Sequence, residues 1–170
     1  MLVLFAGLPG TGKSTLARAV AARVGGAVID KDIVRAALFA ESDIEYSPEQ
    51  DDFCTRLMLE TAEWLWRKHA GRKVMLDGRT FSRASQIDAA LSFAECRAVE
   101  WRIIQCVCSD DTARRRLEAD AGRHLARNRD FALYQELQRT FEPIERPKLV
   151  VDTDRTLEDC ARDCERWLTP

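Results

Sequence analysis

Short apolar runs alternate with longer amphipathic segments along this chain. Strands are expected at the apolar runs, which cover residues 2–6, 27–29, 73–76, 99–107 and 149–151. The segments between them carry apolar residues every three or four positions, which is the period of a helix with one buried face. Strands that alternate with helices form a parallel sheet covered on both sides. The pattern therefore predicts a three-layer α/β/α domain with a five-stranded parallel sheet.

Turn and capping residues set the expected ends of the helices. The first helix is expected to stop at Gly25, because glycine readily takes the backbone angles of a helix end. Ser47, which precedes a proline, is typical of a helix start. The remaining helices are expected over residues 31–39, 48–71, 86–96, 110–120, 131–141 and 156–168. In the last of these, the helical period predicts that Leu157 faces the core.

The composition restricts the classes of function. A chain of 170 residues is expected to form a single domain over 1–170, and its net charge of −2 excludes a strongly basic nucleic-acid coat. No apolar run approaches the roughly 18 residues of a membrane helix, so no membrane partner is expected. The six cysteines include no C-x-x-C pair and no zinc-like grouping with histidine. We interpret them as reduced, buried thiols of a cytoplasmic protein.

Small and acidic residues gather where the expected strands end. Gly7, Asp30, Asp77 and Asp152 each follow an apolar run, and the polar residues 108–110 follow the fourth run. In parallel sheets of this class, ligands bind outside the carboxyl ends of the strands. The sequence therefore predicts that one edge of the sheet carries the functional site.

The segment GLPGTGKS, residues 7–14, matches the phosphate-binding pattern G-x-x-x-x-G-K-[ST] at every fixed position. An apolar strand precedes it and an amphipathic helix follows, which is the context that this motif requires. Lys13 is expected to contact the β- and γ-phosphates, and the Ser14 hydroxyl to bind Mg²⁺. We therefore expect ATP and Mg²⁺ as cofactors, with nucleotide contacts from Gly7, Gly10, Thr11, Gly12, Lys13, Ser14, Thr15 and Arg116.

Acidic residues at two strand ends are candidates for catalysis. Asp77 closes an apolar run and is expected to bind Mg²⁺ together with Ser14, although a turn or capping aspartate would look the same. Asp30 and Asp32 precede a helix, where one aspartate suffices as the N-cap. We therefore favour Asp32 as the base that accepts the proton of an attacking hydroxyl. Asp30 stays the alternative base and is also a candidate substrate contact. Arg35, one helical turn beyond Asp32, would hold the acceptor or the transferred group.

Arginines are expected around the same edge. Arg79 and Arg83 follow Asp77 in a loop and are candidate substrate contacts, although an exposed arginine is as often only a solvated charge. Residues 114–129 are rich in arginine and lie between two helices, which is typical of a lid that closes over phosphates; we place this lid at about 110–142. The choice of a transition-state arginine stays open among Arg116, Arg123, Arg127 and Arg129, with Arg127 as the working assignment.

Together these residues resemble the small-kinase branch of the P-loop kinase superfamily. The Asp-x-x-Arg from Asp32 to Arg35 is similar to polynucleotide 5′-hydroxyl kinase domains, and with Asp30 it is similar to adenylylsulfate kinases. Chloramphenicol phosphotransferases also resemble the chain, and residues 141–153 are similar to a group of bacterial P-loop kinases. The resemblance implies the strand order 2-3-1-4-5, an aspartate base and a lid arginine. One departure is Asp120, which stands where such kinases often have that arginine.

We expect an ATP-dependent phosphotransferase that moves the γ-phosphate to a hydroxyl of a small-molecule acceptor, whose identity the sequence leaves open. The alternative is a polynucleotide 5′-hydroxyl kinase. Residues 40–52, expected beside the acceptor, contain six acidic residues and no Lys or Arg, which disfavours a nucleic-acid backbone. A nucleotide-dependent switch or ATPase is less favoured, because the N-K-x-D motif of guanine-specific switches is absent from the sequence.

Overall fold

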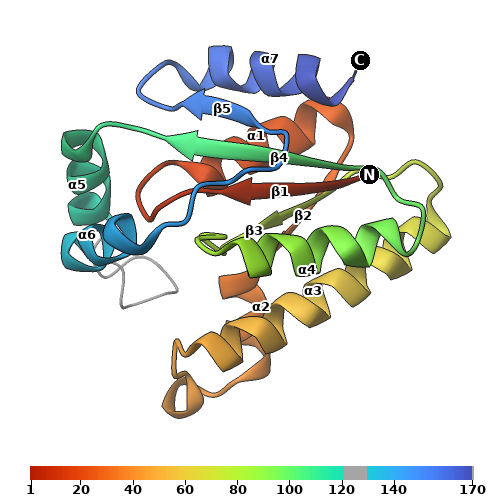
Figure 1. Cartoon of the computed structure of the whole chain (residues 1–170), viewed down its shortest axis with the longest axis horizontal. Coiled ribbons are helices and arrows are strands. Elements are labelled where there is room, and N and C mark those ends of the chain that lie inside the picture. Colours follow the sequence, from red (N-terminus) through yellow and green to blue (C-terminus); the bar gives the residue numbers. More distant parts are fainter. Residues whose placement is uncertain (121–129, 170) are drawn as a thin grey trace.

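A parallel sheet of five strands crosses the centre of the molecule (Figure 1). This computed structural model describes residues 1–120 and 130–169. The strands are β1 (Leu2–Ala6), β2 (Ala27–Asp30), β3 (Val74–Asp77), β4 (Trp101–Val107) and β5 (Leu149–Asp152). Their order across the sheet is β2-β3-β1-β4-β5, and each of these pairings is parallel. The expected fold class and strand order are therefore confirmed.

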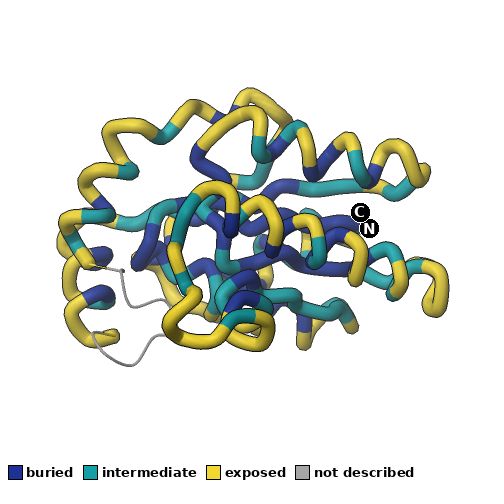
Figure 2. The backbone as a smooth tube through the Cα atoms, turned by 90° about the horizontal axis from the view of Figure 1, so that it is seen from below, coloured by how far each residue is buried: buried dark blue, intermediate teal, exposed yellow. Residues whose placement is uncertain are grey.

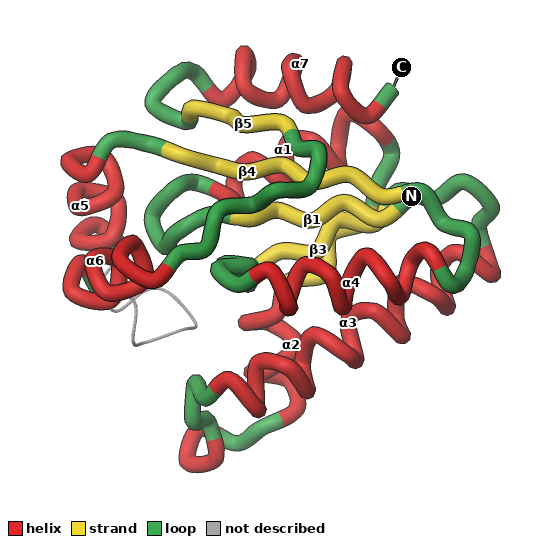
Figure 3. Tube along the Cα trace, in the orientation of Figure 1, coloured by secondary structure: helices red, strands yellow, loops and turns green. Residues whose placement is uncertain are grey.

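Helices cover both faces of the sheet and one of its ends. They are α1 (Lys13–Val24), α2 (Lys31–Leu38), α3 (Pro48–Lys68), α4 (Ala84–Glu95), α5 (Asp110–Ala119), α6 (Phe131–Thr140) and α7 (Leu157–Leu168), with a short 3-10 helix, η1 (Glu41–Asp43). Helices α1 and α7 pack on one face, and α3 and α4 on the other. Helices α5 and α6 lie beyond the carboxyl ends of the strands (Figures 1 and 3).

The alternation of side chains along β1 divides the core into two halves. Val3 and Phe5 belong to the half that α1 and α7 cover, whereas Leu2 and Leu4 belong to the half under α3 and α4. Every residue of β1 is fully buried. In Figure 2 the dark blue of buried residues is concentrated toward the centre of the molecule, and yellow dominates the outer helices. A continuous apolar run is the sequence of a strand that is covered on both faces.

Most helix ends follow the expected signals, with shifts of a few residues. Helix α1 ends at Gly25, which has a φ of 66°, and the Ser47 side chain caps α3. Strand β4 begins at Trp101 rather than at residue 99, because its partner β1 begins at Leu2, which pairs with Trp101. The expectation that Leu157 faces the core is wrong. Its exposed fraction is 46%, because it is the first residue of α7 and lies on the rim of a cavity.

All six cysteines are free thiols, and four of them are buried, namely Cys54, Cys106, Cys160 and Cys164. Burial raises the pKa of Cys106 and of Cys164 to about 12, which keeps both thiols protonated. Cys96 is exposed and Cys108 is half-buried, so the expectation of buried thiols holds for part of the set. None of the described helices is both long enough and apolar enough to cross a membrane.

Candidate functional site

The phosphate-binding loop, residues 7–14, joins β1 to α1 in a conformation that requires glycine. The φ angles are 138° at Gly7, 77° at Gly10 and 77° at Gly12. A Cβ at Gly7 would lie 2.4 Å from the carbonyl oxygen of Cys106, and one at Gly10 would lie 2.9 Å from that of Ala113. These distances leave no room for a side chain, so the backbone itself forms the surface of the loop.

Lys13 begins α1 and turns back over this loop. Its Nζ donates hydrogen bonds to the carbonyl oxygens of Gly7 at 2.7 Å and Leu8 at 2.8 Å, and its exposed fraction is 7%. The ammonium group therefore lies at the N-terminus of α1, where the backbone N–H groups add positive potential. The arrangement is suited to binding an anion such as a phosphate.

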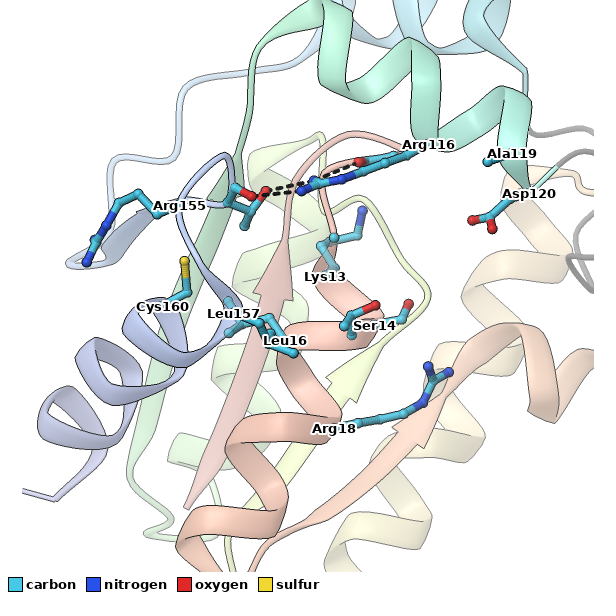
Figure 4. A pocket seen from close by; sticks show the side chains of 14 residues that line it. Lys13, Ser14, Leu16, Arg18, Arg116, Ala119, Asp120, Arg155, Leu157 and Cys160 are labelled. Atoms are coloured by element: carbon cyan, nitrogen blue, oxygen red, sulfur yellow. Dashed lines mark hydrogen bonds between the residues drawn. The ribbon is translucent and has the colours of Figure 1, made fainter.

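The loop borders a cavity of about 530 Å³, which we call the loop cavity (Figure 4). In Figure 4, Lys13 and Ser14 lie on one side of this cavity, and Leu157 and Cys160 of α7 lie on another. The volume is in the range of small-ligand sites. Of the residues expected to contact a nucleotide, the cavity brings together Gly10, Gly12, Lys13, Ser14, Thr15 and Arg116.

Arg116 connects three parts of the loop cavity. Its guanidinium donates to the carbonyl oxygen of Gly10 at 3.3 Å, and to the hydroxyl and carbonyl oxygens of Thr153 at 3.0 and 2.7 Å. The Thr153 hydroxyl in turn donates to the carbonyl oxygen of Thr11 at 2.9 Å. Arg116 thereby ties α5 and the residue after β5 to the phosphate-binding loop. Thr153 ends the segment that resembles bacterial P-loop kinases, but no role in the site was expected for it from the sequence.

Asp77 ends β3 with no exposed surface. Neither of its carboxylate oxygens has a hydrogen-bond partner among the described residues. Because a buried carboxylate without partners is costly, a cation is the ligand that this group would best accommodate. The described residues contain no cluster of three or more His, Cys, Asp or Glu side chains that could hold a metal by themselves. A cation at Asp77 would therefore need further ligands such as phosphate and water, and Ser14 as its second protein ligand stays a prediction.

A second cavity, of about 180 Å³, shares Lys13 and Ser14 with the loop cavity. We call it the Asp32 cavity, because Asp32 and Arg35 both line it. Arg35 Nη1 donates a hydrogen bond to Asp32 Oδ1 at 3.1 Å. The structure thus brings the expected base and its neighbouring arginine to the phosphate-binding loop.

Three further residues of this cavity were missed in the sequence. Asp51, in the first turn of α3, accepts a hydrogen bond from Lys31 Nζ at 2.7 Å and another from Arg35. The Arg35 guanidinium also lies over the ring of Tyr46, 5.1 Å from its centroid. Burial lowers the pKa of Lys31 to about 8, and the nearby Asp32 carboxylate opposes that shift. The acidic character of residues 40–52 was visible, but the ion pairs depend on how α3 folds back onto α2.

Asp30 has a different place from Asp32. Its side chain accepts a hydrogen bond from the backbone N–H of Asp32 at 2.9 Å, which caps α2, and it lies 3.5 Å from Arg18. Among the described residues, Asp30 does not belong to the lining of the Asp32 cavity. Asp30 therefore caps α2, whereas Asp32 lines the cavity. A contact of Asp30 with substrate stays a prediction.

Arg79 and Arg83 do not converge on either cavity. Arg79 is 4% exposed, donates to the Thr55 hydroxyl at 2.8 Å and pairs with Asp52, which ties the loop after β3 to α3. The Arg83 side chain is 61% exposed and lies 3.9 Å from Glu142. Direct substrate contacts of both arginines stay predictions. The other lid candidates, Arg123, Arg127 and Arg129, lie outside the described residues.

Solved structures with the same architecture cover nearly all of this chain. The Mycobacterium tuberculosis APS kinase in complex with AMPPNP and APS has a TM-score of 0.76 and 20% identity, over 99% of this chain and 97% of that one. A gluconokinase from Sinorhizobium meliloti has a TM-score of 0.71 and 18% identity, over 98% and 90%. A sugar kinase from Janibacter has a TM-score of 0.68 and 18% identity, over 98% and 93%.

These likenesses confirm, at the level of the fold, the resemblance to small P-loop kinases. No curated protein matches the sequence. A family model described as an AAA domain matches residues 2–144, which include both the phosphate-binding loop and the residues around Asp32. The chain therefore belongs to the AAA domain family and has the fold of the small P-loop kinases.

Proposed function

We propose that this protein is an ATP-dependent phosphotransferase that moves the γ-phosphoryl group of ATP to a hydroxyl of a small molecule. The observation that carries the proposal is that the loop cavity and the Asp32 cavity share Lys13 and Ser14. Phosphates bound along the loop would end beside Asp32, where a second molecule would fit. The names of the solved neighbours, a gluconokinase and an APS kinase, support a small acceptor.

The proposed reaction assigns one task to each group around the shared loop. Asp32 accepts the proton of the acceptor hydroxyl while the oxygen of that hydroxyl bonds to the γ-phosphorus. The bond from that phosphorus to the β–γ bridging oxygen breaks, and ADP leaves. Lys13 neutralises charge on the phosphate oxygens, and Arg35 holds the Asp32 carboxylate in the cavity.

The residues present fit a magnesium ion. The unpartnered carboxylate of Asp77 and the hydroxyl of Ser14 are the hard oxygen ligands that Mg²⁺ prefers. When bound, the ion would neutralise phosphate charge during the transfer.

We further propose that about residues 110–142 act as a lid over the transferred phosphate, with Arg127 as the transition-state cation. Within the described part of this segment, α5 and α6 are joined by the Arg114 guanidinium, 3.9 Å from the Phe131 ring centroid, and by a 2.7 Å hydrogen bond from Tyr134 to Asp110. This packing joins the two described helices of the proposed lid, within a single domain that we place over 1–170. We place the protein in the cytoplasm, in keeping with its free thiols.

Transfer of labelled phosphate from ATP to a panel of sugars, polyols, antibiotics, nucleosides and 5′-hydroxyl oligonucleotides tests the proposal. We expect label in a small hydroxyl compound, and a strong loss of that label with the Asp32→Asn variant. Label in the oligonucleotides alone would favour the polynucleotide kinase instead. Binding of ATP without transfer to any hydroxyl compound, across a panel that includes all of these classes, would contradict the proposed activity.

A further inference from the structure

The two buried cations of the Asp32 cavity share one counter-ion from another helix. Lys31 and Arg35 both belong to α2, with exposed fractions of 6% and 2%. Both donate to the same oxygen of Asp51, which lies in the first turn of α3. This single carboxylate oxygen therefore occupies the place that an anionic group of a ligand would take between Lys31 and Arg35.

Asp51 is well held in this position. Its backbone N–H donates to the carbonyl oxygen of Ser47 at 2.9 Å, and its carbonyl oxygen accepts from the Thr55 hydroxyl at 2.7 Å. A carboxylate in the first turn of a helix is also stabilised by the helix dipole. Because Asp51 is tethered, it has a high effective concentration at the two cations, and a free anion must compete with it.

The surroundings of the cavity discourage anions as well. Exposed carboxylates lie along η1, the loop that follows it and the first turn of α3, namely Glu41, Asp43, Glu45 and Glu49. Inside the cavity, Asp32 adds a second carboxylate beside Arg35. Carboxylates at a binding site repel an anionic ligand, and such repulsion is one of the ways in which a site discriminates between ligands.

We propose that Asp51 determines the charge of the acceptor, so that the Asp32 cavity takes an uncharged hydroxyl compound of the sugar or polyol class and rejects one that carries a carboxylate or phosphate. That the ligand of this cavity is a phosphate acceptor rests on the proposed function. That the cavity excludes anions does not, and a binding experiment without any transfer can test it.

The first experiment measures binding of inorganic sulfate while a non-hydrolysable ATP analogue with Mg²⁺ fills the phosphate-binding loop. The wild-type protein is expected to show no saturable sulfate binding at the Asp32 cavity. In Asp51→Asn, which leaves Lys31 and Arg35 without their shared anion, sulfate is expected to bind at least roughly tenfold more tightly than in the control Glu49→Gln. Glu49 is exposed in the same helical turn and undergoes the same loss of charge.

A double variant, Asp51→Asn with Lys31→Met, tests whether the sulfate bound by Asp51→Asn lies at Lys31. We expect the double variant to lose this sulfate binding. Equal sulfate affinity in Asp51→Asn and Glu49→Gln would overturn the proposal. So would saturable binding to the wild-type protein that Lys31→Met abolishes, a result that does not depend on whether Asp51→Asn folds.

The second experiment compares matched acceptors, a polyol or aldose and the corresponding sugar acid, in transfer from ATP. We expect the wild-type protein to prefer the uncharged member, and the ratio of the two kcat/KM values to shift by roughly tenfold or more toward the acid in Asp51→Asn. A wild-type preference for the acid would contradict the role proposed for Asp51 but would still support the proposed phosphotransferase activity. No transfer to any compound contradicts the phosphotransferase, and the sulfate experiment then decides the role of Asp51 separately.

Discussion

The side chain of Asp30 accepts a hydrogen bond from the backbone N–H of Asp32, with 2.9 Å between Oδ1 and the nitrogen. This bond caps α2 and satisfies one of the N–H groups that every helix start leaves open. It also fixes the backbone of Asp32, whose carboxylate points to Arg35 at the shared phosphate-binding loop. Asp30 therefore caps the helix whose first turn positions Asp32.

The Asp32→Asn variant is expected to lower kcat by roughly 10²- to 10⁴-fold, because the amide cannot accept the proton of the acceptor hydroxyl. The dissociation constant for ATP should stay close to that of the wild-type protein, since ATP is proposed to lie mainly on residues 7–14. Steady-state kinetics on an acceptor found in the panel, together with calorimetric titration of ATP, measures both quantities.

Asp30→Asn is the matched control, because asparagine is as good an N-cap as aspartate and the charge change is the same. This variant should keep α2 and lose less activity than Asp32→Asn. If Asp30→Asn were inactive and Asp32→Asn nearly normal, the two assignments would be exchanged. If neither variant changed kcat, the pair would serve only the helix start.

Asp77→Asn is expected to raise the unfolding free energy of the ligand-free protein by about 1–3 kcal/mol, because it removes an unpartnered buried charge. The same variant should lose most of the rise in melting temperature that ADP with Mg²⁺ gives to the wild-type protein. Chemical denaturation and thermal scans measure the two effects. Asp88→Asn is a control on the surface, where the carboxylate pairs with Arg146 and its loss should cost at most about 1 kcal/mol.

Transfer itself should stop when a chelator removes divalent cations and should return with Mg²⁺ or Mn²⁺. Full activity in excess chelator would exclude the assignment of Ser14 and Asp77 as metal ligands. Ca²⁺ is expected to compete for the site without restoring turnover, because it prefers longer and less regular coordination than Mg²⁺.

A parallel sheet covered on both faces was accessible from the sequence pattern, most clearly at β1, which is apolar at every position. The order of the strands came from the resemblance to small P-loop kinases, which the motif between β1 and α1 supports. Periodicity together with turn and capping residues also placed all of the described α-helices, with shifts of a few residues at their ends. Leu157 shows the limit of that reasoning. Its position at the start of α7 satisfies the helical period, yet the chain there borders a cavity instead of the core.

The candidate site was only half accessible, for a physical reason. Asp32 and Arg35 lie one turn apart on α2, so their spacing already implied that they share a face. Asp51 and Tyr46 reach the same cavity from a different part of the chain, and no local pattern records that approach. Arg79 is another case, because its bond to Thr55 of α3 and its burial follow from the packing of α3 and not from any local pattern. A contact of Arg79 with substrate stays a prediction.

Asp154, which follows β5 and contacts the start of α5, should make the free energy of unfolding fall at acidic pH. The Ser109 backbone N–H, which donates to Asp154 Oδ2 at 2.9 Å, holds the pKa of that carboxyl below its usual value of 3.8, and the Thr112 side chain contributes. The unfolded chain then binds the proton more readily than the folded one as the pH falls. The stabilisation is therefore complete well above pH 3.8 and is lost as the pH drops through the folded pKa.

Urea unfolding of wild-type protein and Asp154→Asn across pH measures this effect. The wild-type protein should be the more stable one at about pH 7 and at about pH 5, by the same margin. Below about pH 4 the margin should shrink, because the wild-type side chain becomes neutral like that of the variant. A margin that stays constant down to about pH 2.5 would mean that charge has no part in the contact.

Lys13→Ala tests the phosphate-binding loop directly. The Lys13 ammonium is held by the carbonyl oxygens of Gly7 and Leu8, so its loss removes the positive charge and frees those two acceptors. We expect phosphoryl transfer to fall by at least about 10²-fold, the cost of removing a single charge-stabilising donor from an active site. The sheet and its two core halves do not include Lys13, and cooperative unfolding should therefore persist. Lys68→Ala, a change of the same kind at an exposed position of α3, should leave transfer unchanged. A folded Lys13→Ala protein with normal transfer would remove the basis for placing the nucleotide phosphates on this loop.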